Sequence, residues 1–285
     1  MAWQFYSPID VLGSPDFRTA PFRTEAPLEE RRHEQTPTRG LSAAALRGWA
    51  YLFLLLGVVA RAVIQNGLLN LQGVTTQQLL EALRTSDETM ALATASLVLQ
   101  ALEVCAIPIF ALLLVEGFCH TSGFSKYLGR IALVALVSEI PYNLAMGGSW
   151  LVTDSRNPVF ALLIGLILLW LYRHYSEKNA KNIFISILVT AAAILWCGML
   201  RIEHGAFIIA LVAANWFTRG KPIRTLVGAL VSALGVMFSM LYLAAPISAL
   251  AIHFYNDEKG ESSRVFNMAF YPVILLVAYI VTLFI

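Results

Sequence analysis

The sequence has little charge for its length. Only 13% of its 285 residues are Asp, Glu, Lys or Arg, and 58% are hydrophobic, whereas soluble domains carry about 25% charged residues. Together with a mean hydropathy of +0.68, this composition predicts a protein that is surrounded largely by lipid. The formal net charge of +2 does not indicate the basic face that nucleic-acid binding requires.

Metal sites and common catalytic motifs are also missing from the sequence. Cys105, Cys119 and Cys197 lie far apart in apolar segments, where cysteine usually acts as a small buried hydrophobic residue. Their spacing predicts neither a disulfide framework nor a metal centre. There is no Gly-rich phosphate loop, no paired-His metal helix and no Gly-x-Ser-x-Gly elbow. Residue patterns alone therefore indicate a polytopic membrane protein with a polar interior.

Residues 1–46 differ in composition from the rest of the chain. They are rich in Pro, Arg, Glu and Thr and contain almost no aliphatic run, so they cannot bury enough apolar area to offset the entropy of ordering. They also lack the apolar core of a signal peptide. We predict a disordered cytoplasmic tail over residues 1–46 and a transmembrane helical domain over residues 47–285.

The remaining chain is divided into apolar runs, and a membrane helix needs about 20 such residues. Residues 224–255 form either one long helix or two spans that turn near Pro246. Ser42 is placed to cap the first span, and Thr85 and Glu88 have the spacing of a capping box before the second. The expected fold is an all-α bundle of eight or nine spans, with single spans at residues 48–71, 90–118, 127–146, 158–172, 182–199, 205–217 and 266–285.

The distribution of positive charge favours nine spans with the N-terminus in the cytoplasm, because cytoplasmic loops carry excess Lys and Arg. With eight spans, Lys259 and Arg264 would move outside and weaken the asymmetry. With nine spans, the outside loops hold only Arg84, Arg156 and Arg201, and the inside loops hold Lys126, Arg130, Arg173, Lys178, Lys181, Arg219, Lys221, Arg224, Lys259 and Arg264.

Ionisable residues within spans are costly and usually face the bundle interior. Arg61 and Glu103 each lie near the middle of a span. They either neutralise each other as an ion pair or serve a function such as proton relay or ligand contact. Glu116 and His120 lie four residues apart at the end of the second span. They are either functional residues or ordinary polar residues at the membrane interface, where the helix leaves the lipid.

The order of motifs along the chain resembles that of a known family. The segment "IPIFALLLVEGFCHTSGFSKYLGRIALVALVSEIPYNL", residues 107–144, resembles the signature of the TraX family of bacterial membrane proteins. The shared elements are Pro-Ile-Phe, Glu-Gly-Phe, His-Thr, Tyr-x-x-Arg and Ser-Glu-x-Pro. Downstream, "RNPVFALLIG", "RIEHGAF" and "FYNDEKGESSRVFNMAFYPVILL" are similar to family segments in the same order.

This resemblance implies a fold related to transmembrane acyltransferases, in the bacterial cytoplasmic membrane. It also implies acetylation of the N-terminus of a pilin or another protein acceptor, with acetyl-CoA as the cofactor. A carboxylate or imidazole would deprotonate the amine, and a fixed cation or amide would stabilise the oxyanion. The implied catalytic residues are Glu116, His120, Glu139 and His204, and the implied substrate-binding residues are Arg130, Asn143, Asn157, Tyr255, Asn256 and Tyr271.

Several polar positions of the family are replaced in this sequence. The Asp-His pair of the first span is absent from "LLLGVVARAV", and the expected Arg before Pro-Ile-Phe is Val104. The usual Asp-Tyr-Gly is Glu203-His204-Gly205, so His204 can supply an imidazole at a shifted position. Two main hypotheses remain open, an acetyltransferase and a catalytically degenerate membrane scaffold or partner protein. A transporter built on Arg61 and Glu103 is a third.

Overall fold

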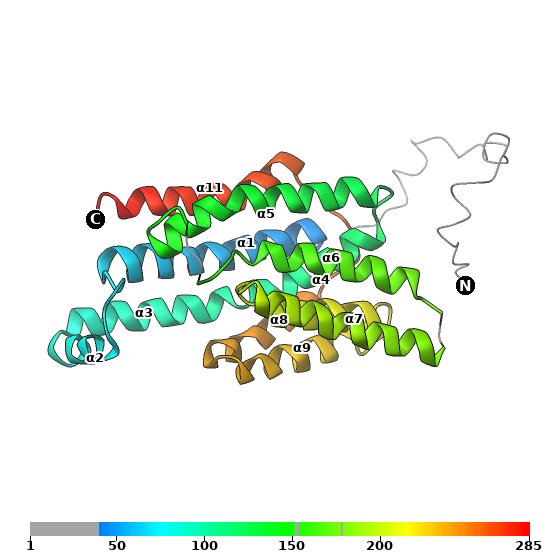
Figure 1. Cartoon of the computed structure of the whole chain (residues 1–285), viewed down its shortest axis with the longest axis horizontal. Helices are drawn as coiled ribbons and strands as arrows, with labels where there is room; N and C mark the ends of the chain where they lie inside the picture. Colours follow the sequence, from blue (N-terminus) through cyan, green and yellow to red (C-terminus); the bar gives the residue numbers. More distant parts are fainter. Residues whose placement is uncertain (1–39, 152–153, 178) are drawn as a thin grey trace. The chain divides into compact units, whose positions relative to one another are not determined.

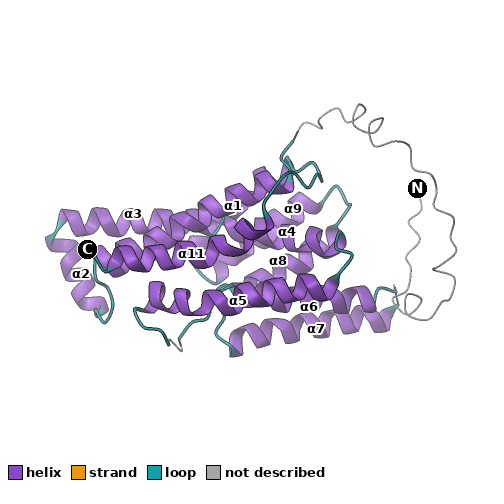
Figure 2. Ribbon diagram, turned by 90° about the horizontal axis from the view of Figure 1, so that it is seen from above, coloured by secondary structure: helices purple, strands orange, loops and turns teal. Residues whose placement is uncertain are grey.

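The computed structural model describes residues 40–151, 154–177 and 179–285, and Leu41–Ile285 form one compact unit. The described residues are helical, apart from turns and two isolated β-bridges (Figures 1 and 2). The all-α prediction is therefore confirmed for the described residues. Most of the predicted tail, residues 1–46, lies outside them, and the first helix begins at Ala43.

The first apolar run forms one continuous helix of 26 residues. Helix α1 (Ala43–Val58) continues directly into the π-helix η3 (Val59–Leu68). The side chain of Ser42 accepts a hydrogen bond from the amide of Ala45, as the sequence predicts. π-helical segments are rare and occur frequently at functional sites, and η3 carries Arg61.

The second predicted span consists of two helices that are preceded by a short amphipathic one. Helix α2 (Thr76–Thr85) buries none of its residues, and α3 (Asp87–Glu103) follows it. The side chain of Ser86 caps α3 by accepting from the amide of Thr89. The predicted capping box of Thr85 and Glu88 is wrong, because α2 extends through Thr85 and the cap falls one residue later.

Helix α4 (Ala106–Cys119) follows α3 after a break at Val104 and Cys105. It is the most buried helix of the bundle, and nearly all of its side chains, including Glu116, are inaccessible to solvent. Glu103 is the last residue of α3 and lies directly before this break.

Helix α5 (Phe124–Gly147) follows and contains Pro141.

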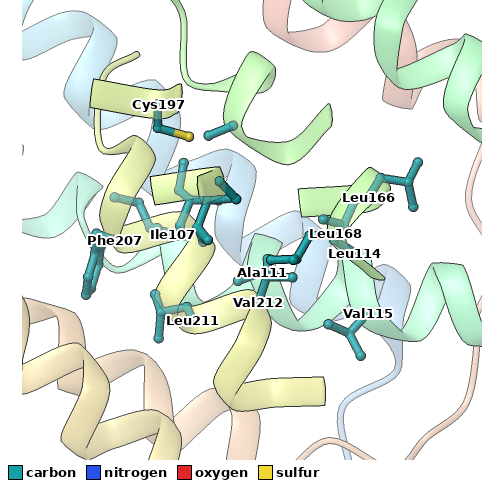
Figure 3. Close-up of a cluster of buried hydrophobic side chains, with 14 of the residues drawn as sticks. Ile107, Ala111, Leu114, Val115, Leu166, Leu168, Cys197, Phe207, Leu211 and Val212 are labelled. Atoms are coloured by element: carbon teal, nitrogen blue, oxygen red, sulfur yellow. The ribbon is translucent and has the colours of Figure 1, made fainter. Parts of the chain in front are cut away.

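Helices α6 (Val159–His174) and α8 (Gly205–Thr218) pack against α4, and α7 (Ala180–Met199) packs against α6 and α8. Figure 3 shows part of the apolar core between them, in which Ile107 and Leu114 of α4 lie in one cluster with the other labelled side chains Ala111, Val115, Leu166, Leu168, Cys197, Phe207, Leu211 and Val212. This packing fixes the start of α8 against α4, next to the break that follows Glu103.

Residues 224–255 fold back on themselves. Helix α9 (Arg224–Leu234) leads through the short η4 (Gly235–Met237) into η5 (Met240–Ile247) and α10 (Ser248–His253), and both η5 and α10 pack against α9.

The position of this turn differs from the prediction. The chain reverses where Ser239 is extended, with φ −162° and ψ 144°, and the Ser239 side chain caps the next helix. Pro246 lies within η5, where it continues a 3₁₀ helix, so the predicted turn near Pro246 is wrong. The last helix, α11 (Arg264–Thr282), packs along α5 (Figure 1).

The predicted count of eight or nine spans is not confirmed. Among the described residues, five helices are long and apolar enough to cross a membrane, and four apolar helices are shorter. At 1.5 Å per residue, the 14 residues of α8 extend about 21 Å, less than the roughly 30 Å of a hydrocarbon core. The chain is a multi-pass membrane protein, and its lipid-facing surface includes the exposed apolar side chains of α7, Ile183, Phe184, Ile187, Leu188, Leu195, Trp196 and Met199.

Candidate functional site

A cavity of about 790 Å³ lies among α1, α4, α5, α6, α8 and α11. Its walls are largely apolar and aromatic, and include Tyr51, Phe110 and Tyr127. Its polar lining residues fall into two groups, which come from different parts of the helices. Small-molecule sites typically occupy about 300–1,000 Å³ and combine apolar walls with a few polar groups.

The first group, here called the mouth, gathers positive charge. It is formed where α1, α5 and α11 begin and α4 ends, together with the loop before α11. A hydrogen bond of 2.8 Å from Arg47 to Ser262 joins two of these elements. The mouth residues are Arg47, His120, Lys126, Arg130, Asp257, Lys259 and Arg264.

Glu116 lies just inside the mouth and is held by two arginines. Arg219 Nη2 lies 3.0 Å from Glu116 Oε2, and Arg224 Nη2 lies 2.6 Å from Oε1. Burial lowers the pKa of the Arg219 guanidinium, but the hydrogen bonds to Glu116 outweigh this effect and raise it. Glu116 therefore ties α4 to the connection between α8 and α9.

His120 is the outer member of the predicted Glu116–His120 pair. Its Nδ1 lies 2.8 Å from the backbone oxygen of Glu116 and 3.7 Å from the carboxylate Oε2. The His120 side chain is 63% exposed, compared with 5% for Glu116. The two residues are adjacent, as their spacing predicts, but only Glu116 is buried.

The second polar group, here called the deep end, consists of Glu103, His204 and Tyr271. Glu103 Oε1 accepts from Arg61 Nη2 at 2.5 Å, which confirms the predicted ion pair between these mid-span residues. Arg61 Nη1 also donates to Glu203 Oε1. One guanidinium thus joins η3, the end of α3 and the loop before α8.

Glycine at position 57 makes the approach of Glu103 to α1 possible. A Cβ atom on Gly57 would lie 2.0 Å from Glu103 Cδ and 2.1 Å from Glu103 Oε2. Glu103 therefore fills the space that any other residue at position 57 would need.

His204 lies between an acid and a tyrosine. Its Nδ1 shares a hydrogen bond with the hydroxyl of Tyr242, and its Nε2 lies 3.6 Å from Glu203 Oε1. Tyr142 donates to the other Glu203 oxygen at 2.7 Å. The backbone of His204 is left-handed, with φ +57°, a conformation that is uncommon for residues other than glycine and often marks functional sites.

Six of the ten predicted site residues line the cavity. Glu116, His120 and Arg130 lie at or near the mouth, Tyr255 also belongs to the lining, and His204 and Tyr271 lie at the deep end. Tyr255 follows α10, and its burial raises the pKa of its hydroxyl to about 12, so it remains a neutral hydrogen-bonding group at physiological pH.

The other four predicted residues are not part of the cavity lining. Glu139 accepts from Asn157 Nδ2 at 2.7 Å and lies 3.5 Å from Arg156 Nη1. Asn143 donates to the carbonyl of Trp150 at 3.4 Å. These contacts stabilise the connection between α5 and α6. Asn256 donates to Glu258 at 3.1 Å in the loop before α11.

Sequence reasoning did not assign Glu203, Tyr142 or Tyr242 to the site, nor did it connect Arg219 and Arg224 with Glu116. The two arginines were used only as indicators of topology. The single indication for Glu203 was its position next to His204, in the segment that departs from the family motif. The tyrosines lie in apolar helices and carry no local signal.

Comparison with known proteins agrees with the motif order. A family model described as TraX protein matches residues 81–282. The curated protein "Probable fimbrial assembly protein FimC, serogroup H1" of Dichelobacter nodosus is 23% identical over 199 residues, which cover 59% of this chain and 75% of that protein. No solved structure matches the chain significantly. Because the family model covers more than half of the sequence, the chain belongs to the TraX family.

Proposed function

We propose that this protein is a membrane acyltransferase that transfers an acetyl group from acetyl-CoA to an amine of a protein acceptor, such as the N-terminus of a pilin. The observation that carries this proposal is the cavity, which joins a basic mouth to a buried deep end containing an imidazole and a carboxylate. The mouth faces the cytoplasm in this proposal, because acetyl-CoA is a cytoplasmic metabolite and the neighbouring loops are rich in Lys and Arg.

The mouth has the chemistry that the phosphates of CoA require. Arg47, Lys126, Arg130, Lys259 and Arg264 surround it, with Asp257 as the exposed acid among the lining residues. Lys and Arg bind phosphate through charge-assisted hydrogen bonds.

The apolar and aromatic walls suit the pantetheine chain, which is long and carries no charge. A ligand with an anionic head and a reactive far end would place its phosphates at the mouth and its thioester towards the deep end. When bound, acetyl-CoA would supply the activated acetyl group. The residues of this chain would bind it, orient it and handle the proton of the acceptor.

A second candidate is a non-catalytic role in pilus or fimbrial assembly. It is favoured by the printed name of the Dichelobacter nodosus relative, a probable fimbrial assembly protein. It is also favoured by Glu116, an acid of the family motif that is paired on both oxygens with Arg219 and Arg224. Such pairing serves the fold whether or not the cavity supports a reaction.

The experiment that separates the two candidates is an acetylation assay with the full chain in lipid nanodiscs. The protein would be incubated with labelled acetyl-CoA and a pilin-like peptide that has a free N-terminal amine. A peptide whose N-terminus is blocked is the control. The transferase proposal predicts label only on the free-amine peptide. Equal labelling with and without the protein would contradict the transferase proposal and favour the non-catalytic role in assembly.

A further inference from the structure

We propose that His204 is the catalytic base of the acyl transfer, and that Tyr242 and Glu203 are positioning residues that hold its ring. This inference rests on the proposed function, because it names the group that handles the proton in that reaction. The cavity offers few groups that can accept a proton, and His204 is the only imidazole at its deep end among the described residues.

The other predicted acids and bases are less suited to this role. Both oxygens of Glu116 face guanidinium groups, those of Arg219 and Arg224, so protonation would leave two cations without their counter-charge. His120 is 63% exposed and lies at the mouth. Glu139 lies outside the cavity lining and is hydrogen-bonded to Asn157.

The contacts of His204 fix which nitrogen faces the reaction. If Nδ1 carries the hydrogen, it donates to the Tyr242 hydroxyl, and Nε2 is left with a free lone pair. This is the tautomer that the proposal requires; in the other tautomer the Tyr242 hydroxyl donates to Nδ1 and the hydrogen is on Nε2. When Nε2 takes a proton, the resulting imidazolium has the carboxylate of Glu203 3.6 Å away.

The backbone around His204 is fixed by close packing. A Cβ on Gly205 would lie 2.6 Å from the Cβ of Cys197, so the turn before α8 is pressed against α7. The Tyr242 ring that orients His204 is itself packed edge-on against Phe207 of α8, with 4.5 Å between ring centroids. Packing therefore fixes both the backbone of His204 and the tyrosine that orients its ring.

The carboxylate of Glu203 offsets part of the cost of protonating the buried His204 during the reaction, whereas the Arg61 guanidinium opposes protonation. The charged groups that surround His204 are Arg61 of η3, Glu103 of α3 and Glu203, and the tyrosines Tyr142, Tyr242 and Tyr271 face the same cluster. With both glutamates ionised, one cation stands against two anions. A protonated His204 brings the cluster to neutrality, whereas uncompensated charge in an apolar interior is costly.

The reaction step then balances without any further reactant. The amine nitrogen of the acceptor attacks the carbonyl carbon of the thioester, so that a C–N bond forms and the C–S bond breaks. The proton lost by the nitrogen passes to Nε2 of His204 and then to the departing thiolate. The products are an N-acetylated acceptor and CoA with a free thiol.

The test uses His204→Gly, because glycine adopts a φ of +57° without strain and leaves room for free imidazole. Turnover would be measured with acetyl-CoA and the free-amine peptide in nanodiscs, with and without added imidazole. We expect the rate to fall by at least about 100-fold, in line with the usual contribution of a general base. We expect imidazole to restore part of it while acetyl-CoA binding stays unchanged.

Two matched controls, Arg201→Gly and Tyr172→Phe, separate an effect on catalysis from an effect on the fold. Arg201→Gly removes a side chain from the same loop at φ +52° and should leave turnover within about twofold. Tyr242→Phe should lower kcat about tenfold with little change in KM, because general-base efficiency depends on correct ring orientation. Tyr172→Phe, which removes another buried hydroxyl whose partner is Thr190, should leave kcat unchanged.

The outcomes distinguish this inference from the proposed function. If the wild-type protein acetylates the peptide and His204→Gly does so at the same rate, His204 is not the base and the transferase proposal stands. A rate that falls without any rescue by imidazole, with an equal fall for Arg201→Gly, also overturns the assignment. If the wild-type protein neither binds acetyl-CoA nor acetylates the peptide, the proposed function fails and this inference fails with it.

Discussion

Replacing Gly57 with alanine tests whether the Arg61–Glu103 pair depends on the missing side chain of α1. The three atoms nearest to the new Cβ all belong to Glu103, the closest at 2.0 Å, whereas ordinary contact begins at 3.4 Å. The carboxylate must therefore retreat by about 1.4 Å. We expect this shift to break the 2.5 Å contact of the carboxylate with Arg61 Nη2.

The size of the effect follows from two opposing contributions. Breaking a buried ion pair costs about 3–5 kcal/mol, and Gly→Ala in a helix recovers about 1 kcal/mol. The free energy of unfolding should fall by about 2–4 kcal/mol. At roughly 2–4 °C per kcal/mol for a chain of this size, the melting temperature in detergent should fall by roughly 4–16 °C.

The assay is thermal unfolding of the purified variants, followed by intrinsic fluorescence. Gly48→Ala is the matched control in the same helix, because its Cβ would meet nothing within 4 Å; it should be neutral or slightly stabilising. In a Glu103→Ala background, Gly57→Ala should lose its destabilising effect. An unchanged melting temperature for Gly57→Ala, or an equal loss in both backgrounds, would refute this reasoning.

Two further predictions concern the mouth. Glu116→Gln leaves Arg219 and Arg224 facing a neutral amide, so the melting temperature should fall by an amount equivalent to about 1–3 kcal/mol; an unchanged value would show that the pairs do not stabilise the fold. Lys126→Ala should weaken acetyl-CoA binding by roughly tenfold and reduce its dependence on salt, because one phosphate contact is lost. Lys221→Ala removes a charge outside the cavity lining and should change neither quantity; an equal effect of both lysine variants in calorimetry would exclude a specific phosphate site.

The helices could be predicted because long apolar runs have few alternatives in a membrane protein. Each predicted apolar run is helical, and the Arg61–Glu103 pair was predictable because two opposite charges at similar depth have a strong reason to meet. The span count was less predictable. Hydropathy does not show whether a 14-residue helix such as α8 crosses the membrane or ends within the protein.

The composition of the site depended on tertiary contacts that no local pattern reports. Glu203 meets Arg61 across 142 positions of sequence, and Tyr242 meets His204 across 38. The motif acids Glu116 and Glu139 look alike in the sequence, but one lines the cavity and the other stabilises a loop. The turn at Ser239 was missed because Pro246 was the stronger local signal, although proline is tolerated in the 3₁₀ helix that forms there.

The most direct test of the central claim is calorimetric titration of acetyl-CoA into the full chain, purified in detergent. The account predicts saturable binding that weakens as salt rises, and desulfo-CoA should compete because it retains the phosphates. It also predicts that a variant lacking both Lys126 and Arg130, two cations of the mouth, loses most of the affinity. Absence of binding by the wild-type protein, or equal binding by this variant, would contradict the claim that the cavity holds an acyl-CoA donor.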